Sequence, residues 1–271
     1  MHVDLCGPPQ TMLATLYAKA LDADSPHSIL HDQHAKSAVD RLDYDWSQTT
    51  ITRRSAPAVA ARSAHFDLWV GQFVAAHPRS VVLHVGCGLD ARVWRIDPGP
   101  EVEWYDIDHA GVISLREQVY SAREHAHLVA ASVTDPAWLT DIPADRPTLL
   151  IGEGLTMYLT RDDGLGLLNR VVARFSSGEL QFDAFSRAGI RAQFTNAVVR
   201  RSGSRLYWGI DSPADIAGVV PGLRLLAALP VVEAATFKQL PWPYPLMGRV
   251  MSSVPVLRRM ATYHRYAFGA V

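Results

Sequence analysis

The chain has 271 residues and 48% of them are hydrophobic, which is enough for one large domain or for one domain with an added cap. Its formal net charge is −1 and it contains no long basic run, so we expect neither a nucleic-acid nor a membrane surface as its main feature. The chain also lacks the roughly 18-residue apolar segment that a membrane span requires.

The two cysteines, Cys6 and Cys87, lie in unrelated contexts and indicate neither a disulfide framework nor a zinc site, so no metal is expected. Residues 1–10 lack the basic start and apolar run of a signal peptide. A reducing cytoplasm is therefore the expected compartment.

The first 78 residues predict helices that precede the sheet. Apolar residues recur at helical spacing over Met12–Leu21, with Thr11 as the expected N-cap, and two more helices are predicted over Asp32–Leu42 and Pro57–His77. On the last of these, Arg62 lies one or two turns before a strongly apolar face. Most arginines in such a place are solvated surface cations.

A strand, a glycine turn, a helix and a second strand follow in that order. Val81–Val85 is a short β-branched and aliphatic run that stops at Gly86-Cys87-Gly88, where the backbone must turn sharply. Leu89–Arg95 can form a helix and Val102–Ile107 a second apolar strand. This order is typical of the first half of a nucleotide-binding α/β unit.

The residue types in this unit fit a nucleoside ligand. Gly86 and Gly88 can adopt positive φ and have no Cβ, so an adenosyl group can lie against bare backbone with its charged end near the amide groups of the turn. The second strand ends at Asp106 and Asp108, about 20 residues after the first glycine, where an acid can accept hydrogen bonds from both ribose hydroxyls. The alternative interpretation is that these acids are solvated, which is the commoner case for acids at strand ends.

The same turn also satisfies the dinucleotide fingerprint, through Gly86-x-Gly88-x-x-Ala91. Against NAD stands Asp90, which would place a carboxylate where a pyrophosphate has to bind. S-adenosylmethionine has no phosphate and tolerates nearby carboxylates, so it is the favoured cofactor.

Two other residues, one in the first strand and one in the turn, invite a catalytic interpretation. His84 interrupts the first strand, but we interpret it as a core histidine that a neighbouring backbone group satisfies. Cys87 is interpreted as a small filler, because no partner base marks it as a nucleophile.

The remaining chain alternates between helices and strands. Residues 201–244 are less regular and rich in proline, and the substrate wall is expected there. The predicted elements are a helix over Ala110–Arg123, strands over His127–Ala131 and Thr148–Ile151, a helix over Asp162–Phe175, a strand over Glu179–Phe185, a helix over Ala188–Arg200 and an antiparallel last strand over Thr262–Phe268.

Three motifs carry a resemblance to a known family: LHVGCGLDARVWRID, YDIDHAG and GEGLTMYL. In combination they resemble the leucine carboxyl methyltransferase family of class I S-adenosylmethionine-dependent enzymes, which includes polyketide O-methyltransferases of the tetracenomycin type. The resemblance covers nearly the whole chain, since it extends to TMLATLYAKALDADSP, ILHDQHA, LDYDW, LPWP and RYAFG.

The resemblance implies an α/β fold with a doubly wound, mostly parallel seven-stranded Rossmann-like methyltransferase sheet, an N-terminal helical preface and a lid. Residues 1–78 would supply helices that form part of the lid. Residues 79–271 would form the cofactor-binding core, with a substrate-cap insertion at about 187–245.

The resemblance also implies roles for single residues. Arg62 matches the place where the family clamps the methionine carboxylate with a planar guanidinium. In the family's pattern Asp108, not Asp106, makes the ribose contact. Glu153 would lie near the methionyl amine or the sulfonium, although it can equally be an acid favoured by a helix dipole.

Ser132 and Val133 match the family's pattern less closely, and Tyr158 allows two interpretations. Where the family has an acid and a leucine at the adenine, this chain has Ser132 and Val133, whose hydroxyl and backbone amide can still contact the purine edge. Tyr158 can face the substrate or belong to the packing.

The predicted function is methyl transfer from S-adenosylmethionine to an oxygen, with a carboxylate of a small molecule or polyketide-like metabolite as the favoured acceptor. A carboxyl group is already ionised near pH 7, so no general base is required and the catalytic residues are left unknown. A phenol or alcohol O-methyltransferase of secondary metabolism would need a base, such as a histidine. An NAD(P)-dependent oxidoreductase would share the glycine turn, and a non-catalytic nucleoside-binding or scaffold protein would share the fold.

Overall fold

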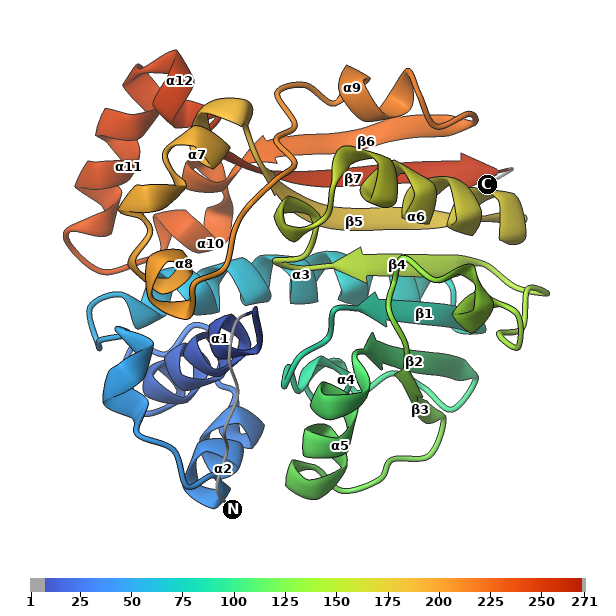
Figure 1. Ribbon diagram of the computed structural model, residues 1–271, viewed down its shortest axis with the longest axis horizontal. Helices are drawn as coiled ribbons and strands as arrows, with labels where there is room; N and C mark the ends of the chain where they lie inside the picture. Colours follow the sequence, from blue (N-terminus) through green and yellow to red (C-terminus); the bar gives the residue numbers. More distant parts are fainter. Residues whose placement is uncertain (1–7, 270–271) are drawn as a thin grey trace.

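The computed structural model describes residues 8–269 and contains one seven-stranded sheet (Figure 1). The strand order is β3-β2-β1-β4-β5-β7-β6, and only the pairs that β7 makes with β5 and β6 are antiparallel. The strands are β1 (Ser80–Val85), β2 (Val102–Asp108), β3 (Ala126–Ala130), β4 (Thr148–Gly152), β5 (Ser177–Phe185), β6 (Leu223–Pro230) and β7 (Ala261–Gly269).

Helices cover both faces of this sheet (Figure 1). The helices are α1 (Pro8–Ala23), α2 (Gln33–Arg41), α3 (Ala56–Ala76), α4 (Arg92–Ile96), α5 (Ala110–Val119), α6 (Arg161–Arg174), α7 (Arg187–Arg191), α8 (Ala197–Ser202), α9 (Ala214–Ala217), α10 (Ala235–Lys238), α11 (Tyr244–Ser253) and α12 (Pro255–Arg258). None of the helices in the described part of the chain is long and apolar enough to cross a membrane.

Strand β1 is buried on both faces, which explains its continuous apolar sequence. Because side chains alternate along a strand, Val81, Leu83 and Val85 pack in one cluster with residues of α6 and α9, while Val82 packs in a second cluster with residues of α3 and α10. The central strands are therefore held from both sides, and their carboxyl ends are placed rigidly.

The predicted doubly wound, mostly parallel seven-stranded sheet with preceding helices is confirmed. One N-terminal boundary was wrong. Thr11 does not cap the first helix, because α1 already begins at Pro8. Prolines fit a first helical turn, whose N–H groups have no intrahelical partner in any case.

Two predictions for the C-terminal half were also wrong. The single helix expected over Ala188–Arg200 is divided into α7, a 3₁₀ turn over Gln193–Thr195 and α8. Asn196 causes the last break, since its side chain accepts hydrogen bonds from the N–H groups of Val198 and Val199 at 3.1 and 3.3 Å.

A strand was missed inside the range expected for the cap. Residues Leu223–Pro230 form β6, an edge strand of the sheet, although their sequence LRLLAALP has no alternation. The pairing register with β7 shifts between Leu225 and Ala227, so the side chains of β6 do not alternate regularly between the two faces of the sheet.

Candidate active site

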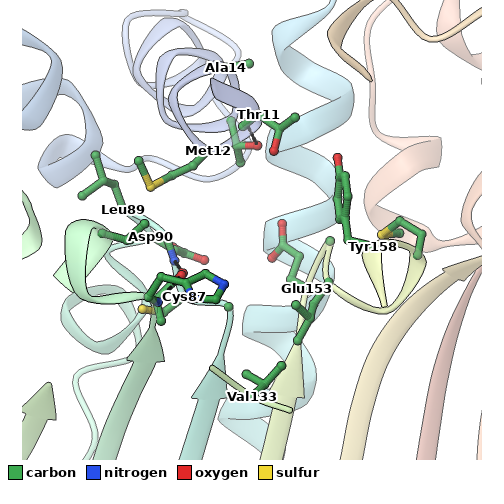
Figure 2. A pocket seen from close by; sticks show the side chains of 18 of the residues that line it. Thr11, Met12, Ala14, Cys87, Leu89, Asp90, Val133, Glu153 and Tyr158 are labelled. Carbon is green, nitrogen blue, oxygen red and sulfur yellow. Dashed lines mark hydrogen bonds between the residues drawn. The ribbon is translucent and has the colours of Figure 1, made fainter. Parts of the chain in front are cut away.

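A cavity of about 550 Å³ lies at the carboxyl ends of β1, β2 and β4, beneath α1 (Figure 2). In open α/β sheets this edge is where ligands bind. Every site residue predicted from the sequence lines this one cavity: Arg62, Gly86, Gly88, Asp108, Ser132, Val133, Glu153 and Tyr158.

The glycine turn closes one side of the cavity with bare backbone. Gly86 and Gly88 have φ values of +63° and +52°, a region that suits glycine. A Cβ on Gly88 would lie 2.9 Å from Cγ of Met12 in α1. The turn therefore needs glycine both for its conformation and for the close approach of the first helix.

The amide groups of the turn are not free for a ligand, contrary to the sequence-based expectation. The N–H groups of Gly86 and Cys87 donate to the Ile107 carbonyl at 2.8 and 3.3 Å, and that of Gly88 donates to Asp108 at 2.8 Å. A pyrophosphate would find these three donors already used.

The two aspartates of β2 have different surroundings. Asp106 is buried, where His84 Nδ1 lies 2.9 Å from its Oδ1, Trp104 Nε1 donates to it at 3.0 Å and the Arg116 guanidinium pairs with it. Burial opposes ionisation, but these partners outweigh it and hold the pKa of Asp106 below its ordinary value. Asp108 instead lines the cavity.

Asp108 is fixed in orientation by backbone groups. Its Oδ2 accepts from the Gly88 N–H at 2.8 Å and its Oδ1 accepts from the His109 N–H at 2.7 Å. A carboxylate has about four acceptor sites, so two remain for ligand hydroxyls.

His84 and Cys87 are both buried, as expected, but the partner of the histidine differs from the prediction. His84 bonds to side chains, with Nδ1 at 2.9 Å from Asp106 and Nε2 at 3.2 Å from the Arg92 guanidinium, and not to a backbone group. Burial raises the pKa of the Cys87 thiol well above its ordinary value, which suits a filler and not a nucleophile.

Arg62 reaches the cavity from α3 and is bound by two carboxylates. Its Nε donates to Glu153 at 2.9 Å, and its NH1 lies 3.6 Å from Asp183 Oδ2. The arginine side chain keeps 26% of its surface exposed, whereas the two acids keep 5% and 8%. The carboxylates thus fix the guanidinium while part of it faces the cavity.

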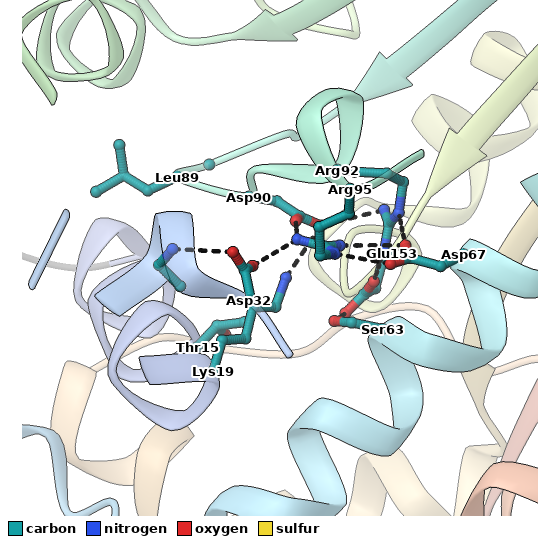
Figure 3. A network of polar contacts seen from close by, with 12 residues as sticks. Thr15, Lys19, Asp32, Ser63, Asp67, Leu89, Asp90, Arg92, Arg95 and Glu153 are labelled. Atoms are coloured by element: carbon teal, nitrogen blue, oxygen red, sulfur yellow. Dashed lines mark hydrogen bonds and ion pairs between the residues drawn. The ribbon is translucent and has the colours of Figure 1, made fainter. Parts of the chain in front are cut away.

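Glu153 is more fully engaged than the sequence indicated. One oxygen accepts from Arg62 and, at 2.8 Å, from the Ser63 hydroxyl, and the other pairs with Arg92 (Figure 3). Burial opposes its ionisation, but the nearby cations Lys19, Arg62 and Arg92 hold the pKa of Glu153 far below its usual range. It is an ionised anchor for two arginines.

A buried ionic network extends from this anchor to the N-terminal helices (Figure 3). Asp90 pairs with Arg92 at 3.2 Å and with Lys19 of α1 at 3.0 Å. Arg95 joins Asp32, the N-cap of α2, to Asp67 of α3. The charge of Asp90 is therefore compensated by neighbouring cations and does not by itself repel an anionic ligand.

The opposite wall of the cavity comes from the loop after β3. Ser132 is partly exposed and its hydroxyl lies 2.8 Å from that of Thr134. Val133 is buried, and its carbonyl accepts from Arg170 at 2.8 Å, so its position is fixed by α6.

Tyr158 lines the far end of the cavity, in the 3₁₀ turn Thr156–Tyr158 (Figure 2). Burial raises the pKa of Tyr158 although a hydrogen bond with Thr11 and the charge of Arg62 oppose this, so the hydroxyl stays protonated near neutral pH. It packs beside an apolar cluster that includes Met157 and Val199. Tyr158 therefore both lines the cavity and packs against this cluster, and its contact with the substrate stays a prediction.

Several lining or supporting residues were not found from the sequence. Met12, Thr15 and Lys19 face the cavity from α1, and their spacing of three and four residues places them on one helix face. That spacing is a signal that could have identified them. Asp183 could not have been identified from the sequence, since only the fold brings β5 next to Arg62.

The donor set fits a zwitterionic nucleoside better than a dinucleotide. The partly exposed guanidinium of Arg62 lies on the α3 side, and the carboxylate of Asp108 lines the cavity at the end of β2. The glycine turn adds backbone without side chains. Among the described residues no group of three or more histidine, cysteine, aspartate or glutamate side chains could hold a metal ion.

Known proteins are similar to this chain along much or nearly all of its length. The family model for leucine carboxyl methyltransferase matches residues 11–172. The tetracenomycin polyketide synthesis O-methyltransferase TcmP of Streptomyces glaucescens is 36% identical over 266 residues, which are 98% of either chain. The S-adenosyl-L-methionine-dependent methyltransferase dpfgK of Gibberella zeae is 36% identical over 244 residues, 82% of either chain.

Solved structures of low sequence identity share the fold. A duf574 family protein from Streptomyces avermitilis has a TM-score of 0.58 at 15% identity and covers 87% of this chain and 90% of its own. The plantazolicin methyltransferase BamL, solved with a triazolic desmethylPZN analog and SAH, has a TM-score of 0.52 at 11% identity and covers 96% and 97%.

Proposed function

This chain belongs to the leucine carboxyl methyltransferase family, and on that premise we propose that it transfers the methyl group of S-adenosylmethionine to a carboxylate oxygen of a polyketide-like small molecule. TcmP, which is similar along 98% of the chain, is a polyketide synthesis O-methyltransferase, and dpfgK, which is similar along 82%, is an S-adenosyl-L-methionine-dependent methyltransferase. The cofactor supplies an electrophilic methyl group on a sulfonium, and the protein supplies binding, orientation and a dry site.

The residues that line the cavity can hold the parts of such a cofactor. The two unused acceptor sites of Asp108 suit the ribose hydroxyls, and the loop residues Ser132 and Val133 suit the purine edge. The bare turn of Gly86 and Gly88 lies between them and Arg62, whose exposed part suits the methionine carboxylate.

Glu153 has a positioning role in this proposal. Three donors already occupy its oxygens, so its main effect is to hold Arg62 in place.

The acceptor is placed at the Tyr158 end of the cavity, next to α8. Val198, Val199 and Phe185 make this wall apolar, and the protonated Tyr158 hydroxyl can donate a hydrogen bond to an acceptor oxygen. Sulfonium and carboxylate neutralise each other as they react, so a site of low dielectric constant favours the transition state over the separated ions.

The choice of a carboxylate acceptor rests on the positions and contacts of the histidines that line the cavity. Of the described residues that line the cavity, two are histidines. His84 is held between Asp106 and Arg92, and His109 is exposed beside Asp108, at the expected ribose end. A phenol would need a base that neither histidine can provide at the acceptor end, whereas a carboxylate needs none.

The test is a methyl-transfer assay that compares an aromatic polyketide carboxylic acid with the same compound lacking the carboxyl group but keeping its phenol. We expect transfer to the acid at a rate that is constant from about pH 6 to about pH 9, because the acceptor is ionised throughout this range. Product analysis should identify a methyl ester.

Transfer to the phenol alone, at a rate that rises with pH through a histidine-like pKa, would instead make the enzyme a phenol O-methyltransferase. Calorimetry with S-adenosylhomocysteine and with NAD provides the separate test of the cofactor, since only the former should bind.

A further inference from the structure

A second feature of the molecule is an apolar surface that no part of the described chain covers. We call it the α11–α12 surface. Its side chains come from α11, α12 and the residues next to these helices, and their exposed fractions are high for large apolar residues: Trp242 81%, Leu246 53%, Val250 55%, Val254 41% and Val256 60%. The five residues belong to adjoining segments of the chain, and exposed apolar patches mark interaction sites.

The surface faces outward because the other side of α11 packs on the protein. Gly248 lies against Phe237, where an added Cβ would come within 3.0 Å of the ring. Leu246 and Val250 are four residues apart and so lie along one stripe of the opposite side, and Trp242 precedes them by the same spacing just before the helix begins. Internal packing therefore does not explain these side chains.

The charged side chains on the segment that carries the surface are all basic. From residue 234 to residue 271 the sequence contains no aspartate or glutamate. Arg258 pairs with Glu233 at 2.5 Å, whereas Arg249 and Arg259 are exposed and pair with no described carboxylate. Exposed apolar side chains with two such guanidinium groups, and no acid on the same segment, suit an anionic partner with an apolar layer.

We infer that the α11–α12 surface docks this protein on the headgroup region of an anionic lipid membrane. In such a contact the apolar side chains enter the boundary between headgroups and acyl chains, tryptophan lies at the headgroup level, and arginines bind lipid phosphates. The sequence alone did not predict this surface, because Arg249 in α11 and Arg259 just after α12 form no basic run.

The arginines of the surface favour a membrane over a second copy of the chain. Neither of the two cavities described for the chain is lined by residues of the surface. In a symmetric contact with a second copy, the same patch and its arginines would face each other. Figure 1 shows α11 and α12 at the same end of the molecule as α8 and α1, so docking would turn the cavity end toward the lipid.

The experiment is co-sedimentation of the full chain with phosphatidylcholine vesicles that contain or lack phosphatidylglycerol. We expect clear binding to the anionic vesicles and weaker binding to the neutral ones. Leu246→Ser with Val250→Ser should lower binding to anionic vesicles about tenfold or more. Burial of two apolar side chains contributes more free energy than the roughly 1.4 kcal/mol that a tenfold change in affinity represents.

A charge variant and a matched control complete the design. Arg249→Glu with Arg259→Glu should remove the preference for anionic vesicles. Leu128→Ser, a half-exposed apolar residue on β3 at the opposite edge of the sheet, should leave vesicle binding unchanged. Calorimetry with S-adenosylhomocysteine should give the same affinity for all variants, which shows that the fold and the site are intact.

Three results would overturn the inference. The folded wild-type chain could fail to bind either type of vesicle, or the Leu246 and Val250 double variant could bind as well as wild type. The third result is that the lipid-free wild-type chain sediments as a dimer, the double variant sediments as a monomer, and vesicle binding is unchanged. That result would assign the surface to contact with a second copy of the chain.

Discussion

At the scale of single residues, the end of β2 offers two aspartates on the same strand face with different partners. We expect Asp108→Ala to weaken binding of S-adenosylhomocysteine by about 1.5–3 kcal/mol, the range for hydrogen bonds to charged groups. The fold should be unaffected, since the side chain lies at the cavity and bonds only backbone N–H groups. Calorimetry measures the loss.

Asp106→Ala is the matched control and should behave in the opposite way. It leaves the Arg116 guanidinium buried without its carboxylate, so we expect a loss of about 3–5 kcal/mol in the free energy of unfolding, measured with urea. If the folded Asp106→Ala protein loses the ligand and Asp108→Ala keeps it, the ribose contact has been assigned to the wrong residue.

At the scale of elements, β7 contains a histidine that resists protonation. His264 is buried, its ring stacks on Phe182 with centroids 5.3 Å apart, and its Nδ1 lies 2.9 Å from the Tyr266 hydroxyl. Burial lowers the pKa of His264 to about 4, against about 6.5 for an unfolded chain. Between these values the unfolded state binds more protons, so stability is complete above about pH 6.5 and falls as the pH falls toward 4.

This histidine alone should therefore cost about 2 kcal/mol of stability between about pH 7.5 and about pH 5. His264→Phe should reduce the difference between urea unfolding free energies at these two pH values by that amount, while Tyr266 keeps the Pro213 carbonyl as an acceptor. His27→Gln, a change at an exposed histidine, should leave the difference unaltered. The same difference in wild type and His264→Phe would show that His264 is protonated as easily in the folded chain as in the unfolded one.

At the scale of the whole molecule, the cavity joins the N-terminal helices to the sheet, and Arg62 is where they meet. We expect Arg62→Ala to weaken binding of S-adenosylhomocysteine by about 1.5–3 kcal/mol and to leave adenosine binding unchanged, because adenosine has no carboxylate. Arg62→Lys should recover only part of the loss, since the planar fork is gone. Calorimetry with both ligands gives the comparison.

Glu153 remains bonded to Ser63 and Arg92 in these variants, so the site should keep its shape. Arg53→Ala, a change at an exposed arginine before α3, is the control and should bind both ligands like wild type. Equal losses for adenosine and S-adenosylhomocysteine in Arg62→Ala would mean that the arginine only supports the structure.

Local sequence was sufficient to predict most of the fold. The strands that became β1, β2, β3, β4, β5 and β7 were each predicted to within two residues at either end, because short apolar runs that end at glycine or polar residues predict strands. β6 was missed because it is an edge strand with no alternation and a shifted register. The helix over Ala188–Arg200 was predicted as continuous because an N-cap inside an apolar segment is a weak signal.

The sequence by itself determined that Gly86, Gly88, Asp108 and Glu153 line one cavity, since glycines and acids at the ends of parallel strands must meet at one edge of the sheet. Only the tertiary structure decided how these residues are paired. Arg62 and Glu153 are 91 residues apart, and Arg62 and Asp183 lie on α3 and β5. No local pattern records which buried charge meets which, because the partners are selected by the packing of whole elements and by the cost of leaving any buried charge unpaired.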